Sequence, residues 1–274
     1  MTTGPRAAQS PDLAAASDIG LRHATNQDHV ALDVDARGCH AIIAVADGVS
    51  STEGAERAAT LAATTTCNYL TGALGQGLPT GDDAVLELFA RAFRRAHEAI
   101  LDTVDEPVGA ATLVAAVAAP DRLLVANIGD TRAYWFPGDG RAIRLTTDDS
   151  LAQAQIDMGV SRAEAEAGTG AHAITRWLGA RATDVNPRVV TYRPRQDGWL
   201  LVCSDGLWNH VPDPPDLADL VAVLVSRAPC GGDGRPDPRW VAEELVRHAN
   251  ACGGHDNVTV ALWRGEGIAA SVGQ

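Results

Sequence analysis

Three apolar, strand-like runs lie so close together in the middle of the chain that the gaps between them leave no room for a helix. The runs span residues 111–118, 122–127 and 133–136, with "PD" in the first gap and "GDT" in the second. Parallel strands need a crossover of about a dozen residues or more, whereas antiparallel strands are joined by short turns. The spacing therefore predicts antiparallel hairpins and argues against a series of βαβ units.

Helical and strand-like segments alternate on both sides of these runs. We expect strands at 41–46, 189–192, 198–203 and 257–263, and helices near 53–70, 82–100, 216–226 and 238–250. In the second helix, Val85, Phe89 and Phe93 repeat at the spacing of one helix face. A polar segment at 148–172, helical near 151–158, is expected to form a flap. Paired helices around antiparallel strands indicate one layered α+β domain.

The length of the chain is consistent with a single large domain. The chain has 274 residues, and 46% of them are hydrophobic, which is enough for a sizeable core. We expect this domain to span residues 13–266, between a flexible N-terminal tail at 1–12 and a C-terminal tail at 267–274. The longest apolar run, 110–119, is far shorter than the ~20 residues of a membrane-spanning helix, so no membrane partner is expected.

The charge and the cysteine content narrow the classes of function. The formal net charge is −13 and all 22 basic residues are arginine, so we expect neither nucleic-acid binding nor a lysine-dependent mechanism. The five cysteines are odd in number, scattered, and contain no C-x-x-C pair. Such spacing predicts neither a disulfide framework nor a zinc site, and it favours reduced thiols in a cytoplasmic protein.

Aspartates stand where apolar strands end or begin. "AIIAVADG" ends at Asp47, "LLVANIGD" ends at Asp130 and "LLVCSDG" ends at Asp205, while Asp256 precedes "NVTVALW". Each Asp-Gly pair alone is more typical of a tight turn than of a ligand. Strands packed side by side, however, bring such carboxylates to a common edge of a sheet.

Carboxylates gathered at one edge repel one another, and a bound cation relieves that repulsion. A set of oxygen ligands selects Mg²⁺ or Mn²⁺ over zinc or copper. A pair of such ions about 3.5–4 Å apart activates a bridging water and holds a phosphoryl group for in-line attack. The pattern therefore predicts that each strand is a rigid support for a metal ligand at its end.

Eight segments between residues 17 and 264 follow one another in a recognisable order. They are "SDIGLRHATNQD" (17–28), "VADGVSS" (45–51), "ATLVAAV" (111–117), "NIGDTRAY" (127–134), "LTTDDS" (145–150), "ITRWLG" (174–179), "LLVCSDGLW" (200–208) and "GGHDNVTV" (253–260). In these segments the chain resembles the metal-dependent protein Ser/Thr phosphatases of the PP2C (PPM) family, in their bacterial form. The resemblance extends over nearly the whole chain.

The resemblance implies a fold and a set of cofactors. The family's fold is a four-layer α/β/β/α sandwich, in which two antiparallel sheets are stacked and flanked by helices on both outer faces. Its metal centre lies in a cleft at one end and holds two or three Mn²⁺ or Mg²⁺ ions. By matching position, Asp47 bridges two ions and Gly48 offers its carbonyl. Asp205 and Asp256 hold one ion, and Asp130 with Asp205 lines a third, weaker position.

The resemblance also implies how the reaction proceeds. Asp28 is expected to orient a metal-bound water, so that Asp28, Asp47 and Asp205 form the catalytic set without a covalent phosphoenzyme. The family's phosphate-binding arginine stands three residues after the glycine of the first motif, where this chain has His23 with Arg22 beside it. Either Arg22 or His23 is expected to bind the substrate phosphate, since a planar guanidinium suits phosphate oxygens.

Other positions depart from the family's pattern. Gln27 replaces a carboxylate at the second metal, Asp149 replaces a histidine, and Asn209 replaces an aspartate. Val49 stands where eukaryotic members carry a histidine that acts as a general acid, so a metal-bound water is expected to protonate the leaving group.

Two functions follow from these observations. The first is Mn²⁺- or Mg²⁺-dependent hydrolysis of phosphoserine and phosphothreonine in proteins, by a monomer whose partners are a Ser/Thr kinase or its targets. The second is a pseudophosphatase that keeps the fold and binds phosphoproteins or a kinase. The substitutions at Gln27 and His23 favour the second function, whereas retention of the strand-end aspartates favours the enzyme.

Overall fold

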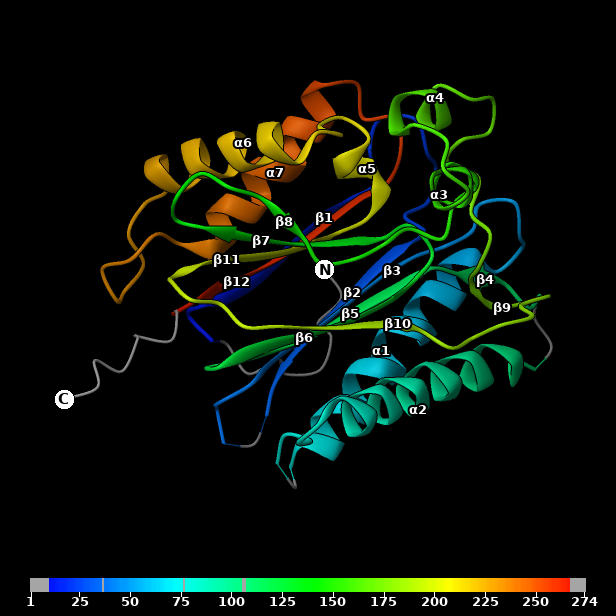
Figure 1. Ribbon diagram of the computed structural model, residues 1–274, viewed down its shortest axis with the longest axis horizontal. Coiled ribbons are helices and arrows are strands. Elements are labelled where there is room, and N and C mark those ends of the chain that lie inside the picture. The colour runs from blue at the N-terminus through cyan, green and yellow to red at the C-terminus, as the bar shows by residue number, and fades with distance from the viewer. Residues whose placement is uncertain (1–9, 36, 76, 105–106, 267–274) are drawn as a thin grey trace.

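The computed structural model of the chain describes residues 10–266 apart from residues 36, 76 and 105–106 (Figure 1). Most of the predicted N-terminal tail and the whole predicted C-terminal tail, at 1–9 and 267–274, lie outside the described residues. Asp12 is packed against the domain rather than free, because its side chain and its carbonyl both accept hydrogen bonds from Arg264. Within the described ranges, no helix has the length and apolar character needed to cross a bilayer.

Two five-stranded antiparallel sheets form the centre of the molecule. The strand order in one sheet is β1 (Leu13–Asp18), β12 (Val258–Gly265), β11 (Gly198–Cys203), β7 (Arg132–Pro137) and β8 (Ile143–Arg144). The order in the other is β10 (Arg188–Tyr192), β6 (Arg122–Ile128), β5 (Leu113–Ala119), β3 (Ala41–Asp47) and β2 (Asp28–Val34). A short pair, β4 (Ala110–Ala111) with β9 (Leu178–Gly179), lies apart from both sheets.

Helices cover the outer faces of the two sheets, as Figure 1 shows. The sheet that contains β3 is covered by α1 (Ala55–Leu74) and α2 (Asp82–Leu101), and the sheet that contains β11 by α6 (Pro214–Arg227) and α7 (Pro238–Ala251). The short helices are α3 (Leu151–Asp157), α4 (Arg162–Glu166) and α5 (Asp205–Trp208). The predicted α/β/β/α sandwich and its α+β class are therefore confirmed.

Apolar side chains fill each of the interfaces between the layers. Ile43, Val114 and Leu200 pack between the two sheets. Phe93 belongs to the core beneath α1 and α2, and Leu245 to the core beneath α6 and α7. Because β3, β5 and β11 contribute to cores on both faces, these strands are continuous apolar runs and not alternating ones, as expected for doubly covered sheets.

The predicted hairpin between β5 and β6 is confirmed, whereas the predicted hairpin between β6 and β7 is wrong. β5 and β6 pair antiparallel in one sheet, but β7 belongs to the other sheet, so the chain crosses the sandwich between them. Gly129 permits the crossing, because its φ of 94° suits glycine, and a Cβ there would lie 2.5 Å from the side chain of Thr112. The crossing places Asp130 between the two sheets.

The expected flap corresponds to α3, α4 and the turns around them. Ala152, Ala165 and Ala171 form a small apolar cluster that holds the two helices together. The flap lies at the same end of the sandwich as α5, on the right in Figure 1. The strands β1, β2, β8 and β9 and the short helices α4 and α5 were not anticipated. Most of β2 is only partly buried, β8 and β9 have two residues each, and α4 and α5 have five and four.

Candidate metal centre

Antiparallel pairing brings strand ends and strand starts to one edge, and the predicted aspartates lie there. Asp47 ends β3 directly opposite Asp28, which begins β2. The end of β11 lies beside the start of β12, so Asp205, just after β11, and Asp256, just before β12, share an edge. Asp130 lies in the crossing between the sheets. The topology therefore explains why residues distant in sequence meet at one end of the sandwich.

The carboxyl groups of Asp28 and Asp205 titrate far from their ordinary range. Burial raises the pKa of Asp28 to about 7, and the charges of Asp205 and Asp256 add to the rise. A hydrogen bond from Ser204 Oγ to Asp28 Oδ2 at 2.7 Å opposes it. Burial and the charge of Asp256 raise the pKa of Asp205 to about 6. Both groups therefore resist ionisation unless a positive charge is present.

The pKa values of Asp47 and Asp130 are raised by the same surroundings. Burial raises the pKa of Asp47 well above its ordinary value, and repulsion from Asp28, Asp205 and Asp130 raises it further. Burial and the charge of Asp205 raise the pKa of Asp130 in the same way. The carboxyls thus share one small region in which Asp28 and Asp130 are buried and Asp47 and Asp205 are half-buried. The structure brings the predicted residues together, while their role as metal ligands stays a prediction.

Within the described residues, two buried carboxylate oxygens of the site lack a hydrogen-bond donor, and a cation can satisfy such atoms. These are Asp28 Oδ1 and Asp205 Oδ1. Within the described part of the chain, no three His, Cys, Asp or Glu side chains form a ready-made cluster around a single point. Mg²⁺ and Mn²⁺ do not require such a cluster, because they retain several waters and use few protein oxygens directly. The donor set therefore fits a hydrated divalent ion.

Glycines let the backbone segments that carry these aspartates approach one another closely. A Cβ on Gly48 would lie 2.7 Å from the carbonyl oxygen of Ala55 and 2.8 Å from that of Gln27. A Cβ on Gly206 would lie 2.0 Å from the carbonyl oxygen of Asn257. Any larger residue would push the strand ends apart, so the Asp-Gly pairs serve close packing and not hairpin turns.

His23 contacts a predicted metal ligand. Its Nε2 lies 3.2 Å from Asp256 Oδ1, and both side chains are partly exposed at 32% and 44%. Arg22 is exposed beside it. The two candidate phosphate-binding residues therefore lie at the rim of the carboxylate cluster, and phosphate binding by either of them stays a prediction.

Asn257 holds the first motif against the site, a role that the sequence analysis missed. Its Oδ1 accepts a hydrogen bond from the backbone N–H of Gln27 at 2.7 Å, and its Nδ2 donates to the carbonyls of Ile19 and Thr25. The Gln27 side chain accepts a hydrogen bond from Ser50 Oγ through Oε1 at 2.8 Å. Gln27, which replaces a carboxylate of the family, thus has a hydrogen-bond partner in Ser50. Its amide oxygen already accepts one hydrogen bond.

Ser204 is a second residue that the sequence analysis missed. Its Oγ donates to Asp28 Oδ2 and accepts the backbone N–H of Thr259 at 3.0 Å. It therefore links the ends of β2, β11 and β12. Its position directly before Asp205 was visible in the sequence, but only pairing across 176 residues reveals the partner.

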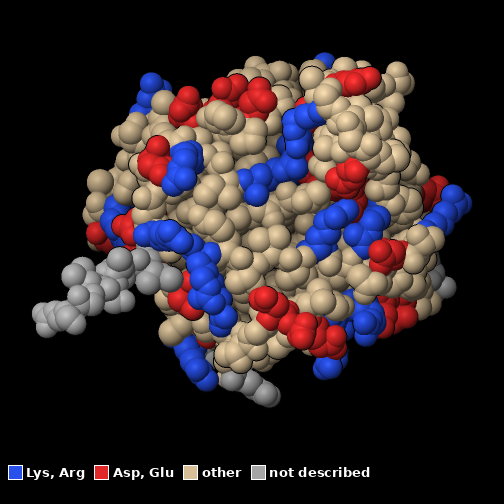
Figure 2. Space-filling model, in the orientation of Figure 1, with Lys and Arg blue, Asp and Glu red and all other residues tan. Residues whose placement is uncertain are grey.

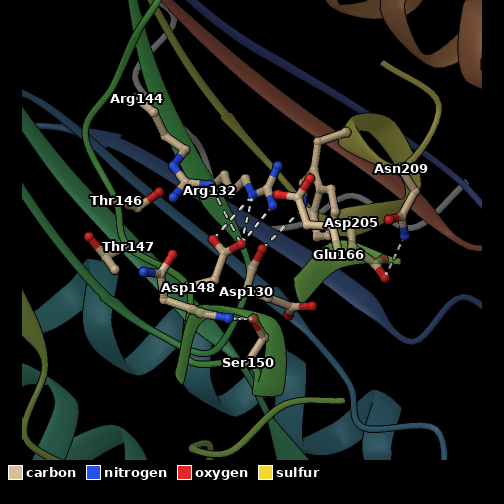
Figure 3. A network of polar contacts seen from close by, with 12 residues as sticks. Asp130, Arg132, Arg144, Thr146, Thr147, Asp148, Ser150, Glu166, Asp205 and Asn209 are labelled. Atoms are coloured by element: carbon tan, nitrogen blue, oxygen red, sulfur yellow. Dashed lines mark hydrogen bonds and ion pairs between the residues drawn. The ribbon is translucent and has the colours of Figure 1, made fainter. Parts of the chain in front are cut away.

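A buried ion pair lies beside Asp130 (Figure 3). Arg132 Nε lies 3.1 Å from each oxygen of Asp148, and Nη2 lies 2.6 Å from Oδ2. Arg132 Nη1 donates to Tyr134 Oη at 3.2 Å, and the guanidinium lies 3.5 Å from the centre of the Trp208 ring. These contacts fix the guanidinium as a rigid positive charge next to the aspartates.

Asp149, which stands where the family has a histidine, has a structural role. Its Oδ2 accepts the backbone N–H of Gly129 at 3.1 Å, so it holds the crossing that positions Asp130. Arg176 Nη1 and Arg188 Nε lie 3.3 Å and 3.1 Å from its oxygens. The two arginines supply the counter-charges that a buried carboxylate requires.

Two cavities flank the aspartates. One of about 890 Å³ lies beside Val49 and is lined in part by Ile174 and Trp177. The other, of about 470 Å³, lies beside Trp208 and Asn209. Asn209 Nδ2 donates to Asp205 Oδ2 at 3.1 Å, so the second cavity adjoins the site directly.

Three bacterial proteins illustrate the similarity in sequence. The serine/threonine phosphatase stp of Listeria innocua is 33% identical over 153 residues, which are 55% of each chain. The serine/threonine protein phosphatase PstP of Mycobacterium tuberculosis is 31% identical over 255 residues, 91% of this chain and 44% of PstP. The protein phosphatase PhpP of Streptococcus pneumoniae is 28% identical, with 92% and 96% covered. The matched region is thus about half the length of the first two relatives.

Solved structures share the fold. The crystal structure of M. tuberculosis PstP/Ppp superposes with a TM-score of 0.72 at 28% identity, covering 93% of this chain and 98% of that one. The PstP catalytic domain in complex with 2 manganese ions gives a TM-score of 0.66 at 28% identity, with the same coverage. The family model described as Protein phosphatase 2C matches residues 21–236, from the first motif to beyond α6. This chain is therefore a member of the protein phosphatase 2C family.

Proposed function

We propose that the chain is a metal-dependent phosphatase that hydrolyses phosphoserine and phosphothreonine in proteins. The observation that carries the proposal is the cluster of aspartates at the strand ends, whose raised pKa values and two unpartnered buried oxygens suit a divalent cation. Family membership and relatives named as serine/threonine phosphatases support the same activity.

The residues that would hold the ions are Asp47, the carbonyl of Gly48, Asp205 and Asp256, with Asp130 at a further position. Mn²⁺ or Mg²⁺ is the proposed cofactor, and two manganese ions in the PstP catalytic domain support Mn²⁺. When bound, such ions supply a Lewis acid and an activated water. All of these ligands belong to strand ends that the two sheets hold in place.

Other residues would orient Asp28, bind the substrate phosphate and fix the wall of the site. Ser204 fixes Asp28 Oδ2, and the buried Oδ1 is left as an acceptor for a hydrogen bond. Arg22 or His23 at the rim would bind the phosphate oxygens, and the contact between His23 and Asp256 links that rim to a metal ligand. Arg132 and its partners fix the wall beside Asp130, where Trp208 donates to the Asp130 carbonyl.

The proposed partners are phosphoproteins, in particular a Ser/Thr kinase or its targets. A monomeric state and a cytoplasmic location belong to the same proposal. The activity of the named relatives supports the class of substrate.

Turnover of p-nitrophenyl phosphate with Mn²⁺, and its loss on adding EDTA, tests the proposal. Asp205→Asn should reduce this turnover by about 1,000-fold or more, because it removes a charged ligand from the site of transition-state stabilisation. Asp219→Asn, the same change at an exposed position on α6, is the matched control and should leave turnover unchanged. A wild-type turnover rate that is the same with Mn²⁺ and with EDTA would contradict the proposal.

The pseudophosphatase alternative predicts a different outcome. It requires phosphopeptide binding without metal-dependent turnover. A protein that only binds phosphopeptides has no need for buried carboxylates held together against their own repulsion. That cost in stability favours the enzyme.

A further inference from the structure

The cavity of about 470 Å³ beside Asp205 is lined by three arginines in a chain with a net charge of −13. Arg132, Arg144 and Arg162 line it together with His172, Trp208 and Asn209. We call this cavity the arginine pocket. Basic side chains lie on this face of the molecule between α6 and α4 (Figure 2). Its arginines come from β7, β8 and the flap helix α4, so the fold brings together charges from separate elements.

Arg132 provides the fixed part of the pocket. Its hydrogen bonds to Asp148 and Tyr134 and its position over the Trp208 ring hold it in one orientation. The side chain of Arg132 is only 8% exposed, so it contributes charge at the floor of the pocket and not a mobile contact.

Arg144 provides donors that are available to a ligand. Its Nη1 lies 3.7 Å from Asp148 Oδ2, which is an ion pair but exceeds hydrogen-bond distance, and its side chain is 18% exposed. Burial, with repulsion from Arg132 and Arg162, lowers the pKa of Arg144 in spite of the attraction of Asp148. One carboxylate thus lies between two guanidinium groups, as Figure 3 shows, and the positive charge of Arg144 is only partly compensated.

The lining also contains two acidic residues, Glu166 and Asp213, at its edge. Glu166 is engaged by Arg162, whose Nη1 lies 2.7 Å from its Oε1. Asp213, the remaining acid, is exposed at the N-terminus of α6. A ligand with two negative charges is the partner that such a set of guanidinium groups favours, because planar guanidinium groups pair with phosphate oxygens in a bidentate way.

The arginine pocket adjoins the aspartate cluster through two direct contacts. Asn209 in its wall donates to Asp205, and Trp208 Nε1 donates to the carbonyl of Asp130 at 3.0 Å. A peptide whose phosphoryl group reached the aspartates would therefore pass the pocket within a few residues, since an extended chain advances about 3.3 Å per residue.

We propose that the arginine pocket binds a second phosphoryl group on the same substrate, so that the chain prefers proteins phosphorylated at two residues close in sequence. This proposal rests on the phosphatase activity proposed above. It assigns Arg144 and Arg162 as specificity-determining residues and Arg132 as the positioning charge beneath them.

The experiment compares three peptides of identical sequence. The first carries one phosphothreonine, the second carries two separated by one residue, and the third carries an aspartate in place of the second phosphothreonine. For wild type with Mn²⁺, kcat/KM for release of the scissile phosphate should be about tenfold higher for the second peptide than for the first, the gain of a charge-assisted pair of hydrogen bonds. The aspartate peptide separates a phosphoryl requirement from a general preference for acids, and a value equal to that of the doubly phosphorylated peptide would overturn the phosphoryl assignment.

Arg144→Ala should reduce the ratio of the two kcat/KM values to near one. Arg162→Ala should lower the same ratio. The Arg162 side chain is 54% exposed and tolerant of change, so this variant tests the proposal if Arg144→Ala fails to fold. Arg141→Ala is the matched control, because Arg141 lies just before β8 but pairs with Asp139 outside the pocket. A wild-type ratio near one, or an equal ratio in wild type and both pocket variants, would overturn the proposal.

Binding without metal separates this inference from the proposed function. Fluorescence anisotropy of the labelled peptides with EDTA-treated protein should show tighter binding of the doubly phosphorylated peptide, and Arg144→Ala should abolish the difference. If p-nitrophenyl phosphate is not hydrolysed but this difference in binding persists, the proposed catalytic function is wrong and the proposed second phosphoryl site is supported. If turnover is normal but the difference in binding is absent, the proposed second phosphoryl site is wrong and the proposed phosphatase activity is supported.

Discussion

Removing one buried charge from the aspartate cluster should make the metal-free protein more stable, not less. Asp28→Asn is the sharpest test, because asparagine keeps an oxygen that accepts the hydrogen bond from Ser204 Oγ while it loses the charge. In the wild type, Asp28 Oδ1 is buried without a donor. The substitution therefore removes a desolvated charge without removing the contact that Asp28 makes.

The magnitude follows from the pKa of Asp28. Burial and the charges of Asp205 and Asp256 raise this pKa from 3.8 to about 7. One pKa unit corresponds to about 1.4 kcal/mol, so a fully ionised Asp28 costs the folded state about 4 kcal/mol in the absence of metal. Because the neighbouring carboxyls titrate together with Asp28, this figure is an upper bound for the single substitution.

The sign of the pH dependence is fixed by the direction of the shift. The folded protein holds a proton on Asp28 that the unfolded chain releases, so the free energy of unfolding falls as pH rises between about 4 and 7. Below that window both states are protonated, and above it the folded state bears the full cost. Between about pH 5.5 and about pH 8, the advantage of Asp28→Asn over wild type should grow by about 2 kcal/mol.

Urea unfolding in EDTA at these two pH values measures the effect, with Asp219→Asn as the exposed control. Adding Mn²⁺ should reverse the order, because the ion stabilises the charged wild-type site more than the variant. The reasoning is refuted if Asp28→Asn is less stable than wild type at the higher pH in EDTA, or if its effect is the same at both pH values.

Further predictions concern the groups that hold the site together. Gly206→Ala should cost about 3 kcal/mol in unfolding free energy and weaken Mn²⁺ binding measured by calorimetry, because its Cβ would lie 2.0 Å from the carbonyl oxygen of Asn257. Arg132→Ala should cost about 3 kcal/mol in urea unfolding, since buried Asp148 loses its hydrogen-bonded partner and keeps only the more distant Arg144. Chelation by EDTA should lower the Tm of wild type at pH 8 but leave that of Asp205→Asn nearly unchanged, which differential scanning fluorimetry can measure.

The sequence predicts the strand-end aspartates because each one follows or precedes an apolar run along the chain. Asp47, Asp205 and Asp256 are visible in that local pattern, and burial of the strands implies that they share an edge. The layered fold is predictable for the same reason, since apolar periodicity and gap length are local properties. The location of the candidate centre therefore needs no contact information.

The partners of those aspartates are not predictable in this way. Ser204 reaches Asp28 across 176 residues, and Arg188 reaches Asp149 across 39 residues. The error at β6 and β7 has the same origin, because a three-residue gap suits a hairpin as well as a crossing between sheets. What distinguishes the two is that β7 pairs with β11 and β8 and not with β6, which depends on tertiary packing.

The close backbone contacts at two glycines explain how carboxylates that repel one another stay close together. Repulsion among the aspartates would spread the strand ends apart if the backbone were free to move. At Gly48 and Gly206 the backbones are packed at distances that exclude even a methyl group, and the cores behind them are rigid. Because the carboxylates cannot separate, protonation or a bound divalent ion must lower the electrostatic free energy, and above about pH 7 the ion is the more effective of the two. The fold thus stores repulsion that metal binding releases, and a variant that loosens either glycine contact should lose metal affinity while it keeps every ligand.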